Sequence, residues 1–243
     1  MSISRNNAPI QADSLRVCLA NQLIGRKIYA FQRVTSTNDL AKRLAEKGEP
    51  EGALIIADCQ TKGRGRFQRH WQSPPGTGLW FSIILRPKIS VENLETIPLL
   101  TGVSVAQAIE TVTGLKPILK WPNDILLTSK KVCGILIESS FTQEKLNYLV
   151  LGIGINVNQQ PLDFSDEIRN RSTSLSIESD HSVDRKDLLL EILHFLELNY
   201  LATMKGKFDL AQEWTKRSLL NDIQRLGKLA SIIPYPTAAV HPS

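Results

Sequence analysis

The sequence has too few cysteines and histidines, at unsuitable spacing, for a covalent or metal-bound framework. Cys18, Cys59 and Cys133 are odd in number and far apart, so they lack the paired spacing of disulfides or zinc sites. We expect all three to be small buried hydrophobic residues. The histidines at positions 181, 194 and 241 show no ligand spacing either. No metal site is therefore predicted.

Long hydrophobic runs are also missing. No apolar stretch reaches the roughly 18 residues that cross a bilayer, and the polar start MSISRNNAPIQAD contains no hydrophobic signal region. The sequence shows no internal repeat and no low-complexity segment. We therefore expect a cytoplasmic protein without membrane contact. Its 243 residues, 42% of them hydrophobic, are enough for one substantial core.

The chain does carry an excess of positive charge, much of it in one loop. Its formal net charge is +5 and its pI is near 9.1. Residues 60–87 read QTKGRGRFQRHWQSPPGTGLWFSIILRP, in which cations surround two glycines that let the backbone approach an anion closely. Charge alone leaves a phosphate site, a solvated turn and a nucleic-acid contact open. The apolar run at residues 78–85 indicates that the loop is fixed onto a sheet.

Hydrophobic periodicity predicts an α+β fold, a mixed β-sheet with helices packed on it. Strands are expected at residues 27–33, 53–59, 78–85, 118–121, 125–127, 132–137 and 148–157. Helices are expected at residues 14–23, 94–109, 186–204 and 209–217, and from the N-cap residues 36–39 to Gly48. The apolar stripe at residues 188–201 fits either the core or a subunit contact, so a homodimer is possible.

Four motifs follow one another along the chain. They are GRGRxxRxWxSPxGxGLxxS at residues 63–82, KWPND at 120–124, CGILIE at 133–138 and GIGINVN at 152–158. In this order and spacing they resemble the catalytic domain of biotin protein ligases, also called biotin–[carboxyl carrier] ligases, over residues 25–200. The resemblance implies the class II synthetase-like fold of biotin and lipoate ligases.

The resemblance also implies a reaction. The family uses ATP, with Mg²⁺, to convert biotin into biotinyl-5′-AMP and pyrophosphate, and then transfers biotin to a lysine of the biotin carboxyl carrier domain of a carboxylase. A carboxylate and a triphosphate repel one another, so cations must neutralise both before the carboxylate reaches the α-phosphorus. The motifs offer Arg64, Arg66, Arg69 and Lys120 for this task.

We assign two of these cations as catalytic, Arg66 and Lys120. Arginine can hold two oxygens at once, so Arg66 and Arg69 are predicted to bind the phosphates and the biotin carboxylate. Lys120 is a compact point charge, predicted to contact the reacting carboxylate and the α-phosphate. An exposed strand lysine is the alternative interpretation of Lys120.

Further site residues follow from the resemblance. Those expected to bind biotin are Ser36, Thr37, Asn38, Gln60, Gly63, Arg64, Gly65, Arg66, Lys120, Gly134 and Gly152, with the first three facing the ureido ring. Those expected to bind ATP are Arg66, Arg69, Trp71, Lys120, Asn123 and Asn156. Simple helix capping by residues 36–38 and core packing by Trp71 are the alternatives.

The two ends of the chain are expected to depart from the family. About 25 residues precede the first predicted strand, which is too few for the winged helix-turn-helix of bifunctional members, so no DNA binding is expected. Residues 1–217 are predicted to form the catalytic domain. Residues 218–243 lack the strand alternation of the SH3-like barrel that usually follows, so this barrel is expected to be truncated or missing.

Two other functions compete with the biotin ligase. Lipoate ligases share the fold and the adenylation chemistry, although their glycine and arginine signature differs from GRGRFQRHW. A non-enzymatic basic module could bind nucleic acid through residues 62–70, but it would not need KWPND or GIGINVN. ATP–pyrophosphate exchange separates the three functions. It should require biotin in a biotin ligase, require lipoate in a lipoate ligase, and be absent in a nucleic-acid-binding module.

Overall fold

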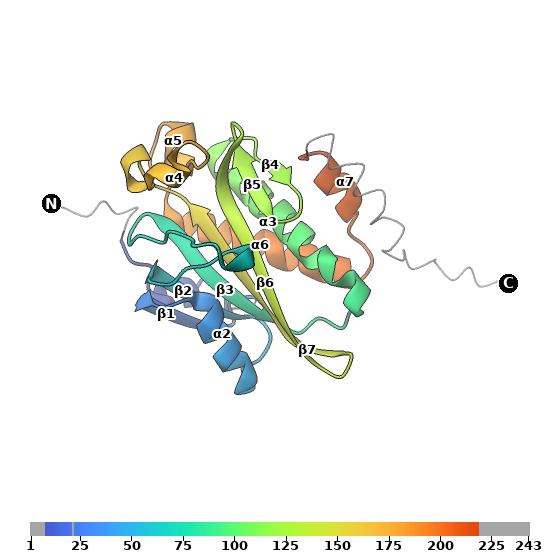
Figure 1. Cartoon of the computed structure of the whole chain (residues 1–243). Helices are drawn as coiled ribbons and strands as arrows, with labels where there is room; N and C mark the ends of the chain where they lie inside the picture. The colour runs from blue at the N-terminus through green and yellow to red at the C-terminus, as the bar shows by residue number, and fades with distance from the viewer. Residues whose placement is uncertain (1–7, 21, 219–243) are drawn as a thin grey trace.

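A computed structural model describes residues 8–20 and 22–218 of the chain (Figure 1). The strands are β1 (Lys27–Val34), β2 (Ala53–Gln60), β3 (Gly78–Leu85), β4 (Ile118–Lys120), β5 (Asp124–Leu127), β6 (Lys130–Thr142) and β7 (Lys145–Asn156). The helices are α1 (Ala12–Arg16), α2 (Thr37–Glu46), α3 (Thr96–Thr113), α4 (Asp166–Arg169), α5 (Leu175–Ser179), α6 (Arg185–Met204) and α7 (Leu210–Thr215).

The strands form one seven-stranded sheet in the order β1-β2-β3-β7-β6-β5-β4. β1 and β2 are parallel, and every other neighbouring pair is antiparallel. The sheet is therefore mixed and carries helices, which confirms the predicted fold class. In Figure 1, α2 lies at the lower end of β2 and β3, whereas α4 and α5 lie at the upper end of the view.

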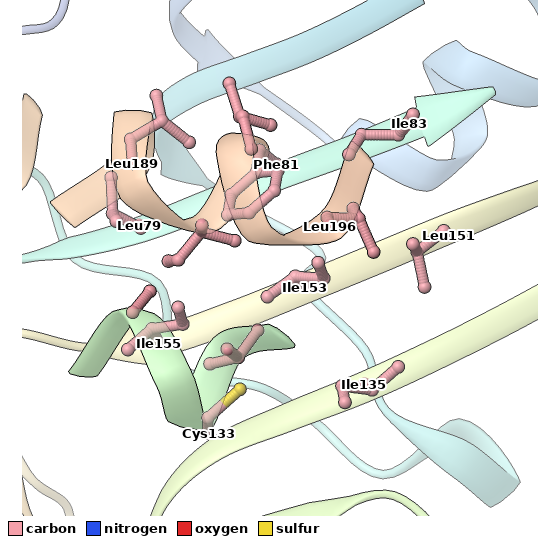
Figure 2. Packing of buried hydrophobic residues seen from close by; sticks show 14 of the residues in the cluster. Leu79, Phe81, Ile83, Cys133, Ile135, Leu151, Ile153, Ile155, Leu189 and Leu196 are labelled. Carbon is pink, nitrogen blue, oxygen red and sulfur yellow. The ribbon is translucent and has the colours of Figure 1, made fainter. Parts of the chain in front are cut away.

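Strict alternation along the central strands separates two faces of the sheet. Every second residue, such as Leu79, Phe81 and Ile83 of β3, belongs to the main core that α3 and α6 cover. Figure 2 shows them beside Ile153 and Ile155 of β7, with Leu189 and Leu196 of α6 packed above. This face buries the larger share of the apolar side chains, so its burial supplies most of the hydrophobic stabilisation.

The opposite face is covered in part by α2. Ala41 and Ala45 of α2 pack on Ile55, Ile84 and Val150 of the strands in a smaller cluster. The helix begins where the Ser36 side chain accepts a hydrogen bond from the backbone N–H of Asp39. Next to α2, this face bears glycines in β6 and β7 instead of bulky side chains, which leaves the sheet surface open.

The structure differs from the predictions at several elements. The predicted helix at residues 14–23 is confined to α1, after which the chain turns so that Leu19 and Ile24 also reach the core. The β6–β7 hairpin is longer than predicted. Helices α4 and α5 were not predicted, because their short polar sequences contain no helical period. In α6, Leu188, Ile192 and Leu196 of the predicted stripe are buried in the core, whereas Leu198 and Leu201 are exposed.

The prediction for the cysteines was only partly right. Cys133 is buried and Cys59 is half-buried, but Cys18 is exposed because it follows the end of α1 on the surface. Among residues 8–20 and 22–218, no helix is both long and apolar enough to span a membrane. The predicted C-terminal remnant lies outside the described residues, apart from Ser218.

Candidate active site

A cavity of about 640 Å³ opens on the glycine-bearing face of the sheet. Its walls come from the start of α2, the loop after β2, the β4–β5 turn, the middle of β6 and β7, and residues 156–172. The predicted site residues that line it are Ser36, Thr37, Asn38, Gln60, Arg64, Gly65, Arg66, Arg69, Trp71, Lys120, Asn123, Gly134, Gly152 and Asn156. Gly63 is the exception, because it packs against its own loop, where a Cβ would lie 2.5 Å from the Trp71 carbonyl oxygen.

Glycines allow two side chains to lie directly on the sheet. A Cβ on Gly152 would lie 2.1 Å from Oδ1 of Asn38, and a Cβ on Gly154 would lie 2.6 Å from Nε1 of Trp71. Gly134, the register partner of Gly154, faces the same indole. The glycines of CGILIE and GIGINVN thus seat Asn38 and Trp71, while the intervening isoleucines point to the core.

We expect Gly152→Ala to destabilise the fold by about 1–3 kcal/mol, as overpacking of a close-packed site commonly does. The new methyl group would collide with the amide of Asn38, which is 4% exposed and held on two sides. Urea unfolding measures the change. Gly65→Ala is the matched control, because a Cβ there would meet its nearest neighbour at 3.9 Å. Equal unfolding midpoints for the two variants would contradict the prediction.

The end of the cavity beside α2 is a network of neutral hydrogen bonds. Gln60 Oε1 accepts from the backbone N–H of Thr37 at 2.8 Å, and its Nε2 donates to Ser73 at 3.0 Å. Ser82 Oγ lies 2.8 Å from Thr37 Oγ1 and 2.6 Å from Asn38 Oδ1. Because the Asn38 oxygen can only accept, the Ser82 hydroxyl donates to it, while the Thr37 hydroxyl donates to Oε1 of Gln60 at 3.1 Å.

Ser36 is the one hydroxyl at this end whose own hydrogen has no acceptor within the described part of the chain. Its Oγ accepts from the backbone N–H of Asp39 and, at 3.3 Å, from Nη1 of Arg64. Both lone pairs are therefore used, and the O–H remains available to a ligand. An oxygen acceptor on the ligand would satisfy it.

A charged network lies behind this polar end. Nη2 of Arg64 donates to Asp39 at 2.6 Å and to both oxygens of Glu138 at 3.0 and 3.1 Å. Glu138 also accepts from Asn38 and Lys42. Two carboxylates thus offset the Arg64 charge, so Arg64 is less available to a ligand anion than we expected from its place in the motif.

The network shifts the pKa values of its acids. The Arg64 guanidinium beside Asp39 holds the pKa of that carboxyl below its ordinary value. For Glu138, burial raises the pKa, but hydrogen bonds from Asn38, Lys42 and Arg64 outweigh it, and the net pKa is lowered. Both acids are therefore ionised at neutral pH.

A pH prediction follows for Asp39. Because its folded pKa is depressed, its ion pair stabilises the fold above the ordinary pKa, and this stabilisation is lost as the pH falls through the folded value. We expect Asp39→Asn to lower the urea midpoint at pH 7, and the difference from wild type to shrink below about pH 4. A difference that stays constant with pH would argue against this role of the ion pair.

The cations near the other end of the cavity differ in exposure. Arg66, Arg69 and Lys120 are exposed, and Arg66 makes one long contact, 3.4 Å from its Nη1 to Oδ1 of Asn123. Lys131 is half-buried inside the cavity, 2.6 Å from Oδ1 of Asp124 and 5.2 Å from the centre of the Trp71 ring. Lys131 is therefore a further charge at the site.

Trp71 and two asparagines complete the wall. The Trp71 ring stands edge-on to Trp80 at 6.4 Å, and its indole N–H has no partner within the described residues. Asn123 donates to the Ile135 carbonyl oxygen at 2.7 Å. Nδ2 of Asn156 donates to the Thr173 carbonyl oxygen at 2.9 Å and Oδ1 accepts from Gln159, which leaves one Nδ2 hydrogen for a ligand.

Four features of the site were missed by sequence reasoning. Lys131 stands next to Lys130 in a strand of ordinary appearance, and Ser82 and Glu138 end two motifs without carrying an evident chemical signal. The segment at residues 163–172 lines the cavity through Phe164, but its polar sequence resembles any surface loop. The strand alternation of CGILIE places Glu138 on the same face as Gly134, which was the one usable clue.

Similarity to known proteins identifies a family. The family model described as "Biotin/lipoate A/B protein ligase family" matches residues 30–156. The chain belongs to this family. The match spans the motifs GRGR, KWPND, CGILIE and GIGIN, and it contains every predicted site residue.

Curated relatives and solved structures extend the comparison. The "Bifunctional ligase/repressor BirA" of Bacillus subtilis is 40% identical over 199 residues, which are 82% of this chain and 61% of that protein. The chain thus spans about three fifths of that relative. The "Biotin--[acetyl-CoA-carboxylase] ligase" of Mycobacterium tuberculosis is 31% identical over 225 residues, which are 88% of this chain and 80% of that protein.

Among solved structures, the biotin protein ligase from Aquifex aeolicus in complex with biotin and ATP matches with a TM-score of 0.69 and 37% identity. The match covers 80% of this chain and 79% of the Aquifex chain.

Proposed function

We propose that this protein is an ATP-dependent biotin ligase. It converts biotin and ATP into biotinyl-5′-AMP and pyrophosphate, and transfers the biotinyl group to a lysine of a biotin carboxyl carrier protein. Family membership and the likeness to the Aquifex protein bound to biotin and ATP support this proposal. The observation that carries it is one cavity with a neutral hydrogen-bonding end and a cationic end.

The neutral end suits the ureido ring of biotin. The ureido carbonyl oxygen is an acceptor, which the free hydroxyl hydrogen of Ser36 can satisfy. Thr37 and Asn38 are held beside it by Gln60 and Ser82. Between this end and the cations, the cavity is lined by Leu136 and by the Asn38 and Trp71 side chains that lie on Gly152 and Gly134, and the apolar valeryl chain of biotin can pack there.

The cationic end suits the reacting anions. A biotin carboxylate oxygen attacks the α-phosphorus, a new P–O bond forms, and the bond to the leaving pyrophosphate breaks. Arg66, Arg69 and Lys120 stand at the rim and Lys131 within, so both the carboxylate and the phosphates meet positive charge. Mg²⁺ enters with ATP as part of the nucleotide substrate, and it shares the phosphate charge with these side chains.

The base of the nucleotide is assigned to the wall near Trp71. The indole offers a broad aromatic face, and the spare Nδ2 hydrogen of Asn156 can donate to a ring nitrogen. Asn123 lies on the cationic side, within 3.4 Å of Arg66, where it can reach the phosphates.

The second half-reaction needs a carrier protein. The ε-amine of a carrier lysine attacks the acyl carbonyl of biotinyl-5′-AMP, an amide bond forms, and AMP leaves. Arg66, Arg69 and Lys120 line the cavity and are exposed to solvent, so a lysine side chain could enter on this side. A biotin carboxyl carrier domain is the partner we propose, and a homodimer in the cytoplasm remains a prediction.

ATP–pyrophosphate exchange tests the first half-reaction. We expect exchange of labelled pyrophosphate into ATP only when biotin is present. Exchange that requires lipoate instead would favour the related lipoate ligase. A lack of exchange with either acid, in protein shown to be folded by circular dichroism, would overturn the proposal.

A further inference from the structure

Glu138 makes contacts that none of the proposed roles uses. It lies on β6, on the same face as Gly134, and its carboxylate accepts hydrogen bonds from three donors on two other segments. Asn38 and Lys42 belong to α2, and Arg64 belongs to the loop after β2. Asn38 and Arg64 line the cavity, whereas Glu138 and Lys42 stand behind them. Glu138 therefore joins two walls of the neutral end without touching a ligand.

The carboxylate decides which way the Asn38 amide points. An asparagine amide carries a donor and an acceptor of nearly equal shape, and the Ser82 hydroxyl beside it can serve either one. An ionised carboxylate can only accept, so it draws Nδ2 to Oε2 of Glu138 at 2.9 Å. The Oδ1 atom is then turned toward Ser82 at 2.6 Å. Without Glu138, both orientations of the amide become available.

Glu138 acts on Ser36 through a second route. Together with Asp39, which accepts at 2.6 Å, Glu138 holds Nη2 of Arg64 through both of its own oxygens, and these charge-assisted contacts fix the guanidinium plane. With Nη2 fixed, Nη1 lies 3.3 Å from Ser36 Oγ and occupies one of its lone pairs. The Ser36 hydroxyl hydrogen is thereby left as a donor to the cavity.

We propose that Glu138 is a positioning residue that sets the direction of the hydrogen bonds at the neutral end, and so determines affinity for the ureido group of biotin. The proposal rests on the proposed biotin ligase function. It assigns Glu138 to the binding of biotin, and it leaves the binding of ATP and the chemical step to the cationic end.

Two variants of the full chain test the proposal. Glu138→Ala removes the acceptor, and Glu138→Gln keeps one acceptor oxygen for Asn38 but loses one of the two negative charges that hold Arg64. Because charge-assisted hydrogen bonds are lost, we expect Glu138→Ala to raise the biotin KM in pyrophosphate exchange by about 10- to 100-fold. The ATP KM and kcat should change by less than about threefold, since the cationic end is intact. Glu138→Gln should restore part of the affinity, and calorimetric titration with biotin alone should give the same ranking.

Lys42→Ala is the matched control. It removes a donor from the same carboxylate, but among the described residues the Lys42 ammonium is bonded to Glu138 alone and does not line the cavity, so the biotin KM should stay within about twofold of wild type. Thermal unfolding is measured for every variant. If Glu138→Ala does not fold, the biotin KM of Glu138→Gln tests the proposal. A wild-type biotin KM in active Glu138→Gln and Glu138→Ala proteins would overturn the role of Glu138 but not the proposed function. A rise of the biotin KM in Lys42→Ala equal to that in Glu138→Ala would do the same. Failure of the wild-type protein to bind biotin would overturn the proposed function as well.

Discussion

Arg66→Ala is expected to slow biotin-dependent pyrophosphate exchange by about 10²- to 10³-fold, the usual cost of removing one preorganised electrostatic contact. Arg66 is exposed and its side chain contacts only Asn123, at 3.4 Å, and the Phe67 ring, at 5.1 Å, among the described residues. Its removal therefore costs the fold little. Loss of the charge should instead slow the reaction, because the carboxylate and the triphosphate repel each other and must approach closely.

A control within the same loop separates this effect from a change in overall charge. Lys62 is exposed and lies outside the cavity, and its backbone N–H is bonded to the Thr35 carbonyl oxygen whatever side chain it carries. Lys62→Ala should therefore keep wild-type exchange, whereas Arg66→Lys should recover only part of the rate, because an ammonium cannot hold two oxygens in the same plane. A wild-type rate in folded Arg66→Ala would rule out the assigned role.

The second large effect is expected from the lysines of the cationic end. Lys120 is exposed at the rim, and Lys131 is half-buried between Asp124 and Trp71. A charge in a partly buried place acts through a lower effective dielectric than one in water. We therefore expect both Lys120→Ala and Lys131→Ala to slow exchange, and Lys131→Ala to slow it more, by about 10²-fold or above.

The effect of Lys131→Ala can be interpreted only if its ion-pair partner, Asp124, is changed as well. Removing Lys131 leaves the Asp124 carboxylate without its ion pair, so the added negative charge could itself repel ATP. The double variant Lys131→Ala with Asp124→Asn removes both charges, and it should remain slow if the ammonium acts directly on the substrates. Recovery of the wild-type rate would show that Lys131 serves only to neutralise Asp124. Lys130→Ala is the control, because this neighbouring lysine is exposed and lies outside the cavity.

Much of the fold could be read from the sequence alone, because strand and helix periods are local properties. The alternation of Ile153 and Ile155 with Gly152 and Gly154 already separates a core face from an open face. The boundaries of most strands agree with those predicted, and the family comparison confirms the resemblance found in the motifs. The short helices α4 and α5 could not be predicted, since their positions depend on contacts with distant strands rather than on a period of their own.

The sequence by itself determined which residue types would be brought to the site, because they stand in four motifs whose glycines, prolines and strand periods constrain the backbone locally. Only the tertiary structure decided what each side chain has as a neighbour. Arg64 and Arg66 are two residues apart in one motif, yet Arg64 is paired with Asp39 and Glu138, 25 and 74 residues away along the chain, and Arg66 is left exposed. Lys131 became a site residue for the same reason, because the charge and burial of a group are set by what packs around it, and that neighbourhood is not local in sequence.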